Sequence, residues 1–225
     1  MAAHSIPSIV STERRARTRS AARVDGAVAV IERVFALALL IAAMPALITC
    51  SIAIMILSRR SPLIAHKRVG RYGSTIWVLK LRTMWNNDGF PRARLIERVS
   101  SSGLTVLPKG RLDPRVTSRF AAFCRKHSLD EVPQLWNVVC GDMALVGPRP
   151  LTKQELEVYY GAKARELLTR KPGITGLWQV RGRSGLTYRQ RRRLDLHLVR
   201  NCNFAMYIYV LLASVPSVLT GRNAW

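Results

Sequence analysis

Residues 128–150 read SLDEVPQLWNVVCGDMALVGPRP and contain the one pair of adjacent carboxylates in the chain, Asp130 and Glu131. The whole chain has 13 acidic residues against 36 lysines and arginines. Two neighbouring carboxylates repel each other unless positive charge is close, and a divalent cation, an arginine cluster or a helix N-terminus can supply that charge. A carboxylate beside a metal ion and a phosphate group is the usual equipment of phosphoryl transfer, so this stretch is the first candidate for a catalytic site.

The residues after the acidic pair predict how it is held. A short helix is expected over Pro133–Cys140, because proline suits a first helical turn and Gly141 is a typical C-terminal stop. The acidic pair would then lie at the positive end of this helix. An ordinary helix cap is the alternative interpretation of the two acids.

Composition limits the class of protein. The 225 residues suffice for one domain with a real core, and the net charge of +23, with 29 arginines among the 36 basic residues, implies an anionic partner. Nucleic acid, an acidic membrane surface and a phosphorylated substrate all fit that charge. The four cysteines form no CxxC pair, which argues against a zinc ribbon or a disulfide framework and suits a reducing compartment.

An uncharged apolar run of 24 residues, Val34–Leu57, is long enough to cross a hydrocarbon core of about 30 Å as a helix. An ordinary transmembrane helix and a secretory signal peptide are alternative interpretations of such a run. Basic residues flank both of its ends, however, and such flanks favour the cytoplasmic side. Because Pro45 near the middle would kink the helix, we expect a re-entrant membrane helix over residues 31–60 that returns to the same face.

The rest of the chain predicts an α/β (mixed, helix-rich) small globular domain over residues 61–225, with interfacial amphipathic helices at its C-terminal end. Residues 1–30 are basic and are expected to form a disordered arm on anionic lipid. Phe204–Leu219 is apolar but short for a span, so an interfacial helix is expected there and a second span is the alternative. Further predicted elements are two strands within Ile64–Met84, helices at Pro114–Lys126, Lys153–Thr169 and Leu186–Leu198, and a strand at Leu177–Val180.

Four blocks of the chain resemble, in order, those of the bacterial sugar transferases, the monotopic phosphoglycosyl transferases that begin polysaccharide and glycoconjugate assembly. The blocks are KLRTM (80–84), the stretch 128–150, KPGITGLWQV (171–180) with GRS (182–184), and Leu194-Asp195. The resemblance covers about residues 31–219. The short chain and its ending PSVLTGR (216–222) are similar to the exopolysaccharide-initiating undecaprenyl-phosphate hexose-1-phosphate transferases. Met44 and Ala36 depart from the family's membrane segment, which often has serine and aspartate there.

This resemblance implies transfer of a sugar 1-phosphate from a UDP-sugar to undecaprenyl phosphate, with release of UMP, as the first step of exopolysaccharide assembly. It implies a covalent phosphosugar-aspartate intermediate, Mg²⁺ as cofactor and a catalytic domain on the cytoplasmic face of the inner membrane. The implied partners are the UDP-sugar donor, the polyprenyl phosphate acceptor and membrane lipids, with downstream glycosyltransferases as further candidates and no nucleic acid. Glucose and galactose are the leading sugars, and the sequence leaves the oligomeric state open.

The resemblance also assigns roles to residues. Asp130 is expected to be the nucleophile and Glu131 a magnesium ligand, with Asp130 also close to the metal. Lys80 shares a strand face with Arg82 and is expected near the acidic pair, although a solvated strand face is the alternative. Asp195 is expected to be a further active-site acid, with salt bridges to neighbouring arginines as the alternative. Contacts to phosphate or substrate are expected from Arg82, Arg125, Arg149 and Arg183.

Two features receive a different interpretation. The arginine run 189–193 is expected to face solvent or the membrane, and Asp142 is either a helix cap or a supporting group of the site. The alternative function is a membrane-tethered basic protein that binds nucleic acid or anionic lipid. It would need aromatic residues for stacking among the basic ones, and Tyr188 alone stands beside the arginine run.

Overall fold

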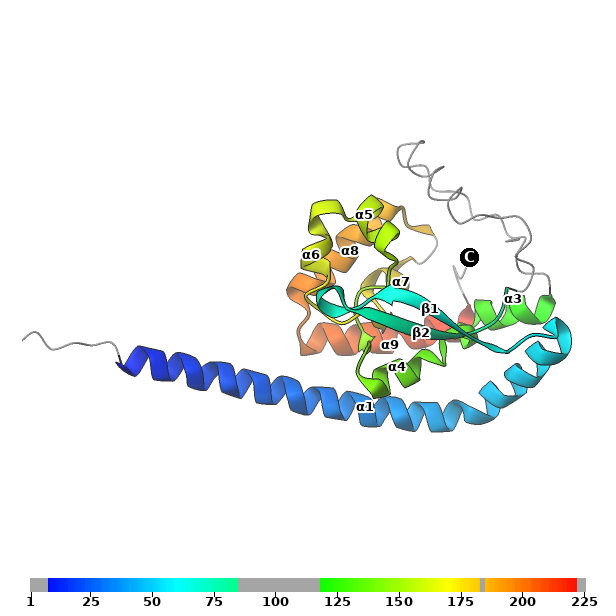
Figure 1. The fold of residues 1–225 in the computed structure, drawn as a ribbon, viewed down its shortest axis with the longest axis horizontal. Helices are drawn as coiled ribbons and strands as arrows, with labels where there is room; N and C mark the ends of the chain where they lie inside the picture. The colour runs from blue at the N-terminus through cyan, green and yellow to red at the C-terminus, as the bar shows by residue number, and fades with distance from the viewer. Residues whose placement is uncertain (1–7, 85–117, 183–184, 222–225) are drawn as a thin grey trace, which may run out of the picture.

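The computed structural model describes residues 8–84, 118–182 and 185–221, with side chains from residue 26 onward apart from those of Ala27, Ser217 and Leu219. Within these ranges the chain is helix-rich and has two small sheets of two strands each (Figure 1). The expected mixed, helix-rich fold is therefore confirmed, while Arg183 and residues 114–117 of the helix predicted at Pro114–Lys126 lie outside the described residues.

The first element is one long helix, α1, which runs from Ser8 to Ser58 and contains Pro45. Its part Val28–Ser58 is long and apolar enough to cross a membrane, and 11 % of its apolar window is buried against the rest of the chain. Figure 1 shows α1 running along one side of the domain and bending toward β1 in its last turns. The backbone is helical from Ser8, inside the 1–30 segment for which composition predicts a disordered arm, and the alanines and arginines of that segment are good helix formers.

The predicted hairpin is present. Strands β1 (Leu63–Val69) and β2 (Thr75–Leu81) pair antiparallel across the short η1 turn, Arg71–Gly73. Along β2, Ile76 and Val78 are buried. Lys80 points to the same face as these two residues, because side chains two apart in a strand share a face.

The acidic pair lies between two helices. Helix α3 (Arg119–Lys126) leads to the η2 turn, Leu129–Glu131, which is followed by α4 (Gln134–Cys140). Gly141 ends α4 with a φ of +85°, a left-handed conformation that favours glycine. The short helix and its glycine stop are as predicted.

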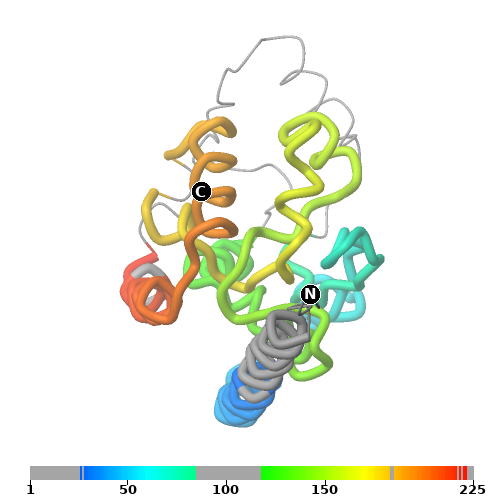
Figure 2. Tube along the Cα trace, turned by 90° about the vertical axis from the view of Figure 1, so that its left-hand side faces the viewer, coloured from blue at the N-terminus to red at the C-terminus, as the bar shows by residue number. Residues whose placement is uncertain are grey.

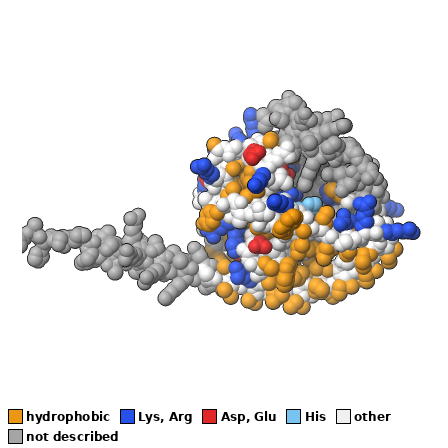
Figure 3. All heavy atoms as spheres, viewed as in Figure 1, with side chains coloured by type: hydrophobic (Ala, Val, Ile, Leu, Met, Phe, Trp, Pro, Cys, Tyr) orange, Lys and Arg blue, Asp and Glu red, His pale blue; other side chains and the backbone are white. Residues whose placement is uncertain are grey.

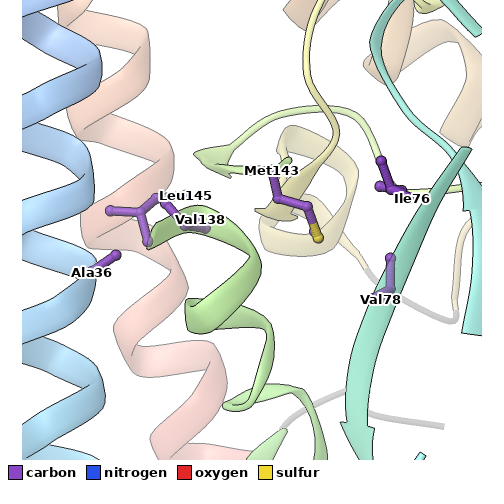
Figure 4. Packing of buried hydrophobic residues seen from close by; sticks show 6 residues of the cluster. All are labelled: Ala36, Ile76, Val78, Val138, Met143 and Leu145. Atoms are coloured by element: carbon purple, nitrogen blue, oxygen red, sulfur yellow. The ribbon is translucent and has the colours of Figure 1, made fainter. Parts of the chain in front are cut away.

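Three elements far apart in the sequence meet in one apolar cluster. It joins Ala36 of α1, Val138 of α4 and Val78 of β2, together with Ile76, Met143 and Leu145. Figure 4 shows Ala36 next to Val138 and Leu145, with Met143 directed toward the strand. The departure from the family at Ala36 thus falls at a packed position, where a small side chain lets α1 approach α4.

The second sheet was not predicted. Strand β3 (Ala144–Val146) pairs in parallel with β4 (Gly173–Thr175). A Cβ atom on Gly173 would stand 2.1 Å from the Gly147 backbone nitrogen. The two chain segments can therefore approach this closely only because both residues are glycine. The close contact fixes the start of the Gly-Pro-Arg-Pro turn that carries Arg149.

The helices of the second half differ in part from the predictions. Lys153–Thr169 is not one helix but α5 (Lys153–Tyr159), the η3 turn (Gly161–Lys163) and α6 (Ala164–Leu167), because Gly161 adopts a φ of +50°. Leu177–Val180 is not a strand but belongs to α7 (Leu177–Arg181). The two predicted C-terminal helices are present as α8 (Tyr188–Asn201) and α9 (Phe204–Thr220).

Apolar side chains gather on one side of the molecule. Figure 2 shows α1 and α9 in the lower half of the domain, with α5 and α8 above them. In Figure 3 the hydrophobic atoms lie along the lower side, where α1 runs. Large exposed hydrophobic residues of the described chain include Val34, Ile48, Ile52 and Ile56 of α1, Trp136 of α4, and Phe204 and Leu212 of α9. A continuous apolar face of this kind marks an interaction with lipid or with another protein.

Candidate active site

One cavity of about 500 Å³ brings together the four residues predicted to be catalytic. Lys80, Asp130, Glu131 and Asp195 all line it, although they come from β2, η2 and α8. Arg125 and Arg149 line the same cavity. The positions of these six residues agree with the sequence-based assignment of a site, while their roles stay predictions.

Asp130 is held in a buried and unusual place. Ser128, two residues before it, has a φ of +56°, a conformation that is uncommon outside glycine and sharply turns the chain into η2. The side chain of Asp130 is buried. Burial raises the pKa of this carboxyl to about 6, and the charge of Glu131 acts in the same direction, while the charges of Lys80 and Arg125 lower it. Asp130 is therefore a carboxylate that has lost much of its hydration.

Glu131 forms an ion pair with Lys80, whose Nζ lies 2.7 Å from Glu131 Oε1. Asn137 of α4 aligns the two elements that carry this pair. Its Nδ2 donates to the Trp77 carbonyl oxygen at 2.8 Å, and its Oδ1 accepts from the Leu79 amide at 3.0 Å. The buried amide of Asn137 thereby fixes the open edge of β2 next to α4, which sets the distance between Lys80 and Glu131.

Asp195 is the second buried acid of the cavity, with 1 % of its surface exposed. The Tyr160 hydroxyl donates a hydrogen bond to Asp195 Oδ2 at 2.6 Å. Burial raises the pKa of Asp195 to about 7, against the opposing effects of the Tyr160 hydrogen bond and of the charges on Arg149 and Arg191. Such a carboxyl changes its protonation state near neutral pH, as a group that binds or transfers protons does.

Sequence reasoning missed a group of arginine and aromatic side chains that line the cavity. This arginine–aromatic wall consists of Arg149, Arg191, Trp178 and Tyr188. Arg191 lies over the Trp178 ring at 4.8 Å and over the Tyr188 ring at 5.3 Å, and Arg149 lies 5.8 Å from the Trp178 ring. Tyr159 stacks on Tyr188 with ring centroids 4.0 Å apart. The interpretation of residues 189–193 as a solvated or membrane-facing run is wrong for Arg191, which lines the cavity. Its spacing of four from Asp195 was the available signal, since residues four apart share a helix face.

The other predicted residues lie elsewhere. Arg82 donates through Nε to the Ser61 carbonyl oxygen at 2.8 Å and is not among the residues that line the cavity. Asp142 is exposed and also lies outside the cavity. Arg183 lies outside the described residues. Of the four arginines expected to bind phosphate, the structure places Arg125 and Arg149 at the site.

The acidic pair fits a magnesium ion better than a tightly ligated transition metal. Within the described residues there is no group of three or more His, Cys, Asp or Glu side chains arranged for a metal. Mg²⁺ is usually bound through one or two carboxylates plus substrate phosphates and water, so two adjacent carboxylates suffice for it. Burial and the charge of Glu131 raise the pKa of Asp130, so ionisation of this carboxyl costs free energy in the folded protein. A cation bound beside it would offset that cost.

Buried carboxylates and cationic side chains thus meet in one cavity, next to helices with an exposed apolar surface. The bacterial sugar transferase family matches residues 25–221, and the chain belongs to this family. The resemblance inferred from the sequence blocks is thereby confirmed.

Individual relatives agree with this assignment. The chain is 37 % identical over 166 residues to the exopolysaccharide production protein ExoY of Sinorhizobium fredii, with 71 % of each chain covered. It is 39 % identical over 198 residues to a UDP-galactose-lipid carrier transferase of Erwinia amylovora, with 84 % of this chain and 40 % of the relative covered. A UDP-glucose:undecaprenyl-phosphate glucose-1-phosphate transferase of Caulobacter vibrioides is 36 % identical over 189 residues, with 80 % and 65 % covered. The chain thus spans less than two thirds of the length of the last two relatives.

Proposed function

We propose that this enzyme transfers a hexose 1-phosphate from a UDP-sugar to undecaprenyl phosphate and releases UMP, as the first step of exopolysaccharide assembly. The observation that carries the proposal is the cavity in which Asp130, Glu131, Lys80 and Asp195 meet, next to a wall built from the apolar helices α1 and α9. The names of the relatives, which refer to UDP-sugars and undecaprenyl phosphate, support the same reaction class.

In the first step of this proposal, a carboxylate oxygen of Asp130 attacks the phosphorus that bears the sugar. A bond forms between that oxygen and the phosphorus, the bond from the phosphorus to the bridging oxygen breaks, and UMP leaves with the electron pair. The buried carboxylate suits this role, because it has lost the hydration that weakens a nucleophile in water. Lys80 and Arg125 offset the negative charge around the phosphorus.

Magnesium would be held by Glu131 and Asp130 together with phosphate oxygens of the donor, and when bound it neutralises the charge of the diphosphate. Lys80 already contacts Glu131, so the lysine keeps that carboxylate oriented toward the cavity. The arginine–aromatic wall of Arg149, Arg191 and Trp178 offers cationic groups and a ring face for the nucleotide part of the donor.

The contacts of α1 support a helix that stays on one side of the membrane. Glu32, before the apolar run, accepts hydrogen bonds from the Leu145 amide and the Tyr207 hydroxyl, each at 2.6 Å. Cys50 and Ile54, near its other end, are buried against the same domain, beside Leu81 and Cys124. A straight span would carry one end of α1 about 30 Å across the hydrocarbon, away from that domain. We therefore infer a re-entrant α1, with the catalytic domain on the cytoplasmic face and α9 in the interface.

The proposal is tested with purified enzyme in detergent, undecaprenyl phosphate and UDP-glucose or UDP-galactose in turn. Release of UMP that depends on Mg²⁺ and yields a lipid-linked hexose diphosphate is expected with one of the two donors. Glu157→Gln, a substitution at an exposed helix position outside the cavity, serves as the control and should keep the activity of the unmodified enzyme. Release of UDP instead of UMP would contradict the proposed reaction, because UDP would mean transfer of the sugar without its phosphate.

A further inference from the structure

The cavity has a second wall, which none of the catalytic assignments uses. This α1–α9 wall consists of Leu39 from α1 and Leu211, Ser214 and Val218 from α9. These four residues line the same cavity as Asp130, so the nucleophile and two apolar helices face one continuous space. An apolar wall offers no group that would bind a charged nucleotide. Binding of the UDP-sugar donor therefore does not explain the α1–α9 wall.

The two helices of this wall are tied to the domain at different places. At one end, the Tyr207 hydroxyl of α9 donates to Glu32 of α1 at 2.6 Å. Toward the other end of α9, the ring nitrogen Nδ1 of His127 lies 3.0 Å from the Val218 carbonyl oxygen, three residues before Asp130 in the chain. The polar bridge between α1 and α9 thus lies at one end of the wall, while the other end of α9 is fixed to the loop that carries the nucleophile.

Outside the cavity, the same helices carry exposed apolar residues. Leu39 itself is 39 % exposed, so it belongs both to the cavity and to the apolar surface of α1. Ile48 and Ile52 continue the exposed surface along α1, and Leu212 does so along α9. Figure 3 shows hydrophobic atoms along the lower side of the molecule, where α1 runs. Leu39 therefore connects the cavity to that surface.

We propose that the α1–α9 wall is the binding site for the isoprenoid chain of the acceptor, which reaches Asp130 from the apolar side of the molecule. The inference rests on the proposed function and adds to it the route of the second substrate. A cavity of about 500 Å³ accommodates a headgroup and the first part of a long chain, so the remainder of the chain lies outside the cavity in the surrounding lipid. The lipid phosphate stands beside Arg125 and Lys80, two cations that line the cavity and whose charges act on Asp130.

The second chemical step follows from this placement. An oxygen of the lipid phosphate forms a bond to the phosphorus of the phosphosugar, while the bond between that phosphorus and the Asp130 oxygen breaks. The aspartate leaves as a carboxylate, and the product is a lipid diphosphate sugar. Because the isoprenoid chain stays on the apolar side, the polar end of the cavity with Arg149 and Arg191 remains available to the nucleotide.

Tryptophan substitutions test the site by filling it. Leu39→Trp and Ser214→Trp place a large side chain on the α1–α9 wall, whereas Ile41→Trp and Val215→Trp do so at neighbouring positions that are 63 % and 51 % exposed and lie outside the cavity. Two rates are measured for each variant: UMP release from the UDP-sugar in a single turnover without lipid, and steady-state turnover over a range of undecaprenyl phosphate concentrations.

The wall variants should release UMP in the single turnover within about twofold of the unmodified rate. Their kcat/KM for undecaprenyl phosphate should fall about tenfold or more, mainly through a higher KM, as expected when uniform binding of a substrate is lost. The two control variants should keep both rates. Because Leu39 is partly exposed, its tryptophan needs little space in the packed interior, and this variant alone decides the question if Ser214→Trp does not fold.

Unchanged KM for the lipid in Leu39→Trp, or an equal loss in Ile41→Trp, would overturn the proposed lipid site. An equal loss in both half-reactions would do so as well, because the wall would then affect the whole cavity. Failure of the unmodified enzyme to release UMP without lipid is a different result. It would contradict the covalent step of the proposed function and, with it, the basis of this inference.

Discussion

Replacing Asp130 by asparagine should abolish turnover and at the same time make the protein more stable at neutral pH. The pKa of Asp130 is raised from 3.8 to about 6, first by burial and then by the charge of Glu131. The folded state therefore holds the proton of Asp130 more tightly than the unfolded chain does. Stability contributed by this group is fully present below pH 3.8 and is lost as the pH rises through about 6.

The size of this effect follows from the difference between the two pKa values. Each pKa unit corresponds to about 1.4 kcal/mol, so ionised Asp130 costs the folded state about 3 kcal/mol at pH 8. The asparagine side chain has nearly the same shape as the aspartate it replaces and no charge, so the variant should recover most of that amount. For a chain of this size, the gain corresponds to a rise in melting temperature of roughly 5–10 °C. At pH 4.5 the gain should shrink to about 1 kcal/mol, since Asp130 is then mostly protonated in the folded state.

The assay is thermal unfolding in detergent at pH 8 and pH 4.5, with EDTA present so that no metal ion compensates the charge. Glu157→Gln removes an acid at an exposed position outside the cavity, and should give the melting temperature of the unmodified protein at both values of pH. Addition of Mg²⁺ at pH 8 should narrow the gap between Asp130→Asn and the unmodified protein, because an ion that binds only the folded state stabilises it. An Asp130→Asn variant that is no more stable at pH 8, or equally stabilised at both values of pH, would refute the reasoning.

Four further predictions concern the site and the membrane helix. Lys80→Met removes a charge that lowers the pKa of Asp130, so the acidic limb of the pH–rate profile of UMP release should move from about pH 6 to higher pH, and an unmoved limb would exclude this role. Glu131→Gln should raise the Mg²⁺ concentration needed for half-maximal activity about tenfold or more, whereas full activity in EDTA would disprove the metal assignment. Cysteines introduced as Ser20→Cys and Lys67→Cys, in a background without the native four, should both resist a membrane-impermeant thiol reagent on intact cells and react after lysis; labelling of position 20 alone would show an ordinary span. Pro45→Leu should shift α1 toward that spanning form and lower activity. A variant that keeps both topology and activity would show that the basic residues on both sides of the apolar run, and not the kink at Pro45, keep α1 re-entrant.

The parts of the fold that follow local rules could be predicted from the sequence. The alternation along β2, and Gly141 after α4, identify elements whose signals lie within a few neighbouring residues. The acidic pair of Asp130 and Glu131 could be singled out for the same reason, because two adjacent acids in a basic chain need a local explanation.

What the sequence did not show depends on contacts between distant residues. Strand β4 exists because it pairs with β3, and Gly173 alone in the sequence looks like part of a loop. The break between α5 and α6 comes from the left-handed backbone of Gly161, although a single glycine is tolerated within many helices. Arg191 looked like one member of a charged run, and its place in the cavity depends on the Trp178 ring from α7. The burial of Asp195 likewise depends on Tyr160, which lies on another element.

Asp130 is proposed to carry the phosphosugar between donor and acceptor, and the mass of the enzyme after exposure to the donor alone tests this role. The enzyme is mixed with its UDP-sugar and Mg²⁺ without lipid, quenched, and examined as intact protein and as peptides. The account predicts one hexose phosphate per chain, located on Asp130, which disappears when undecaprenyl phosphate is added. A chain that turns over both substrates yet never carries the phosphosugar, or carries it on a residue other than Asp130, would contradict the account.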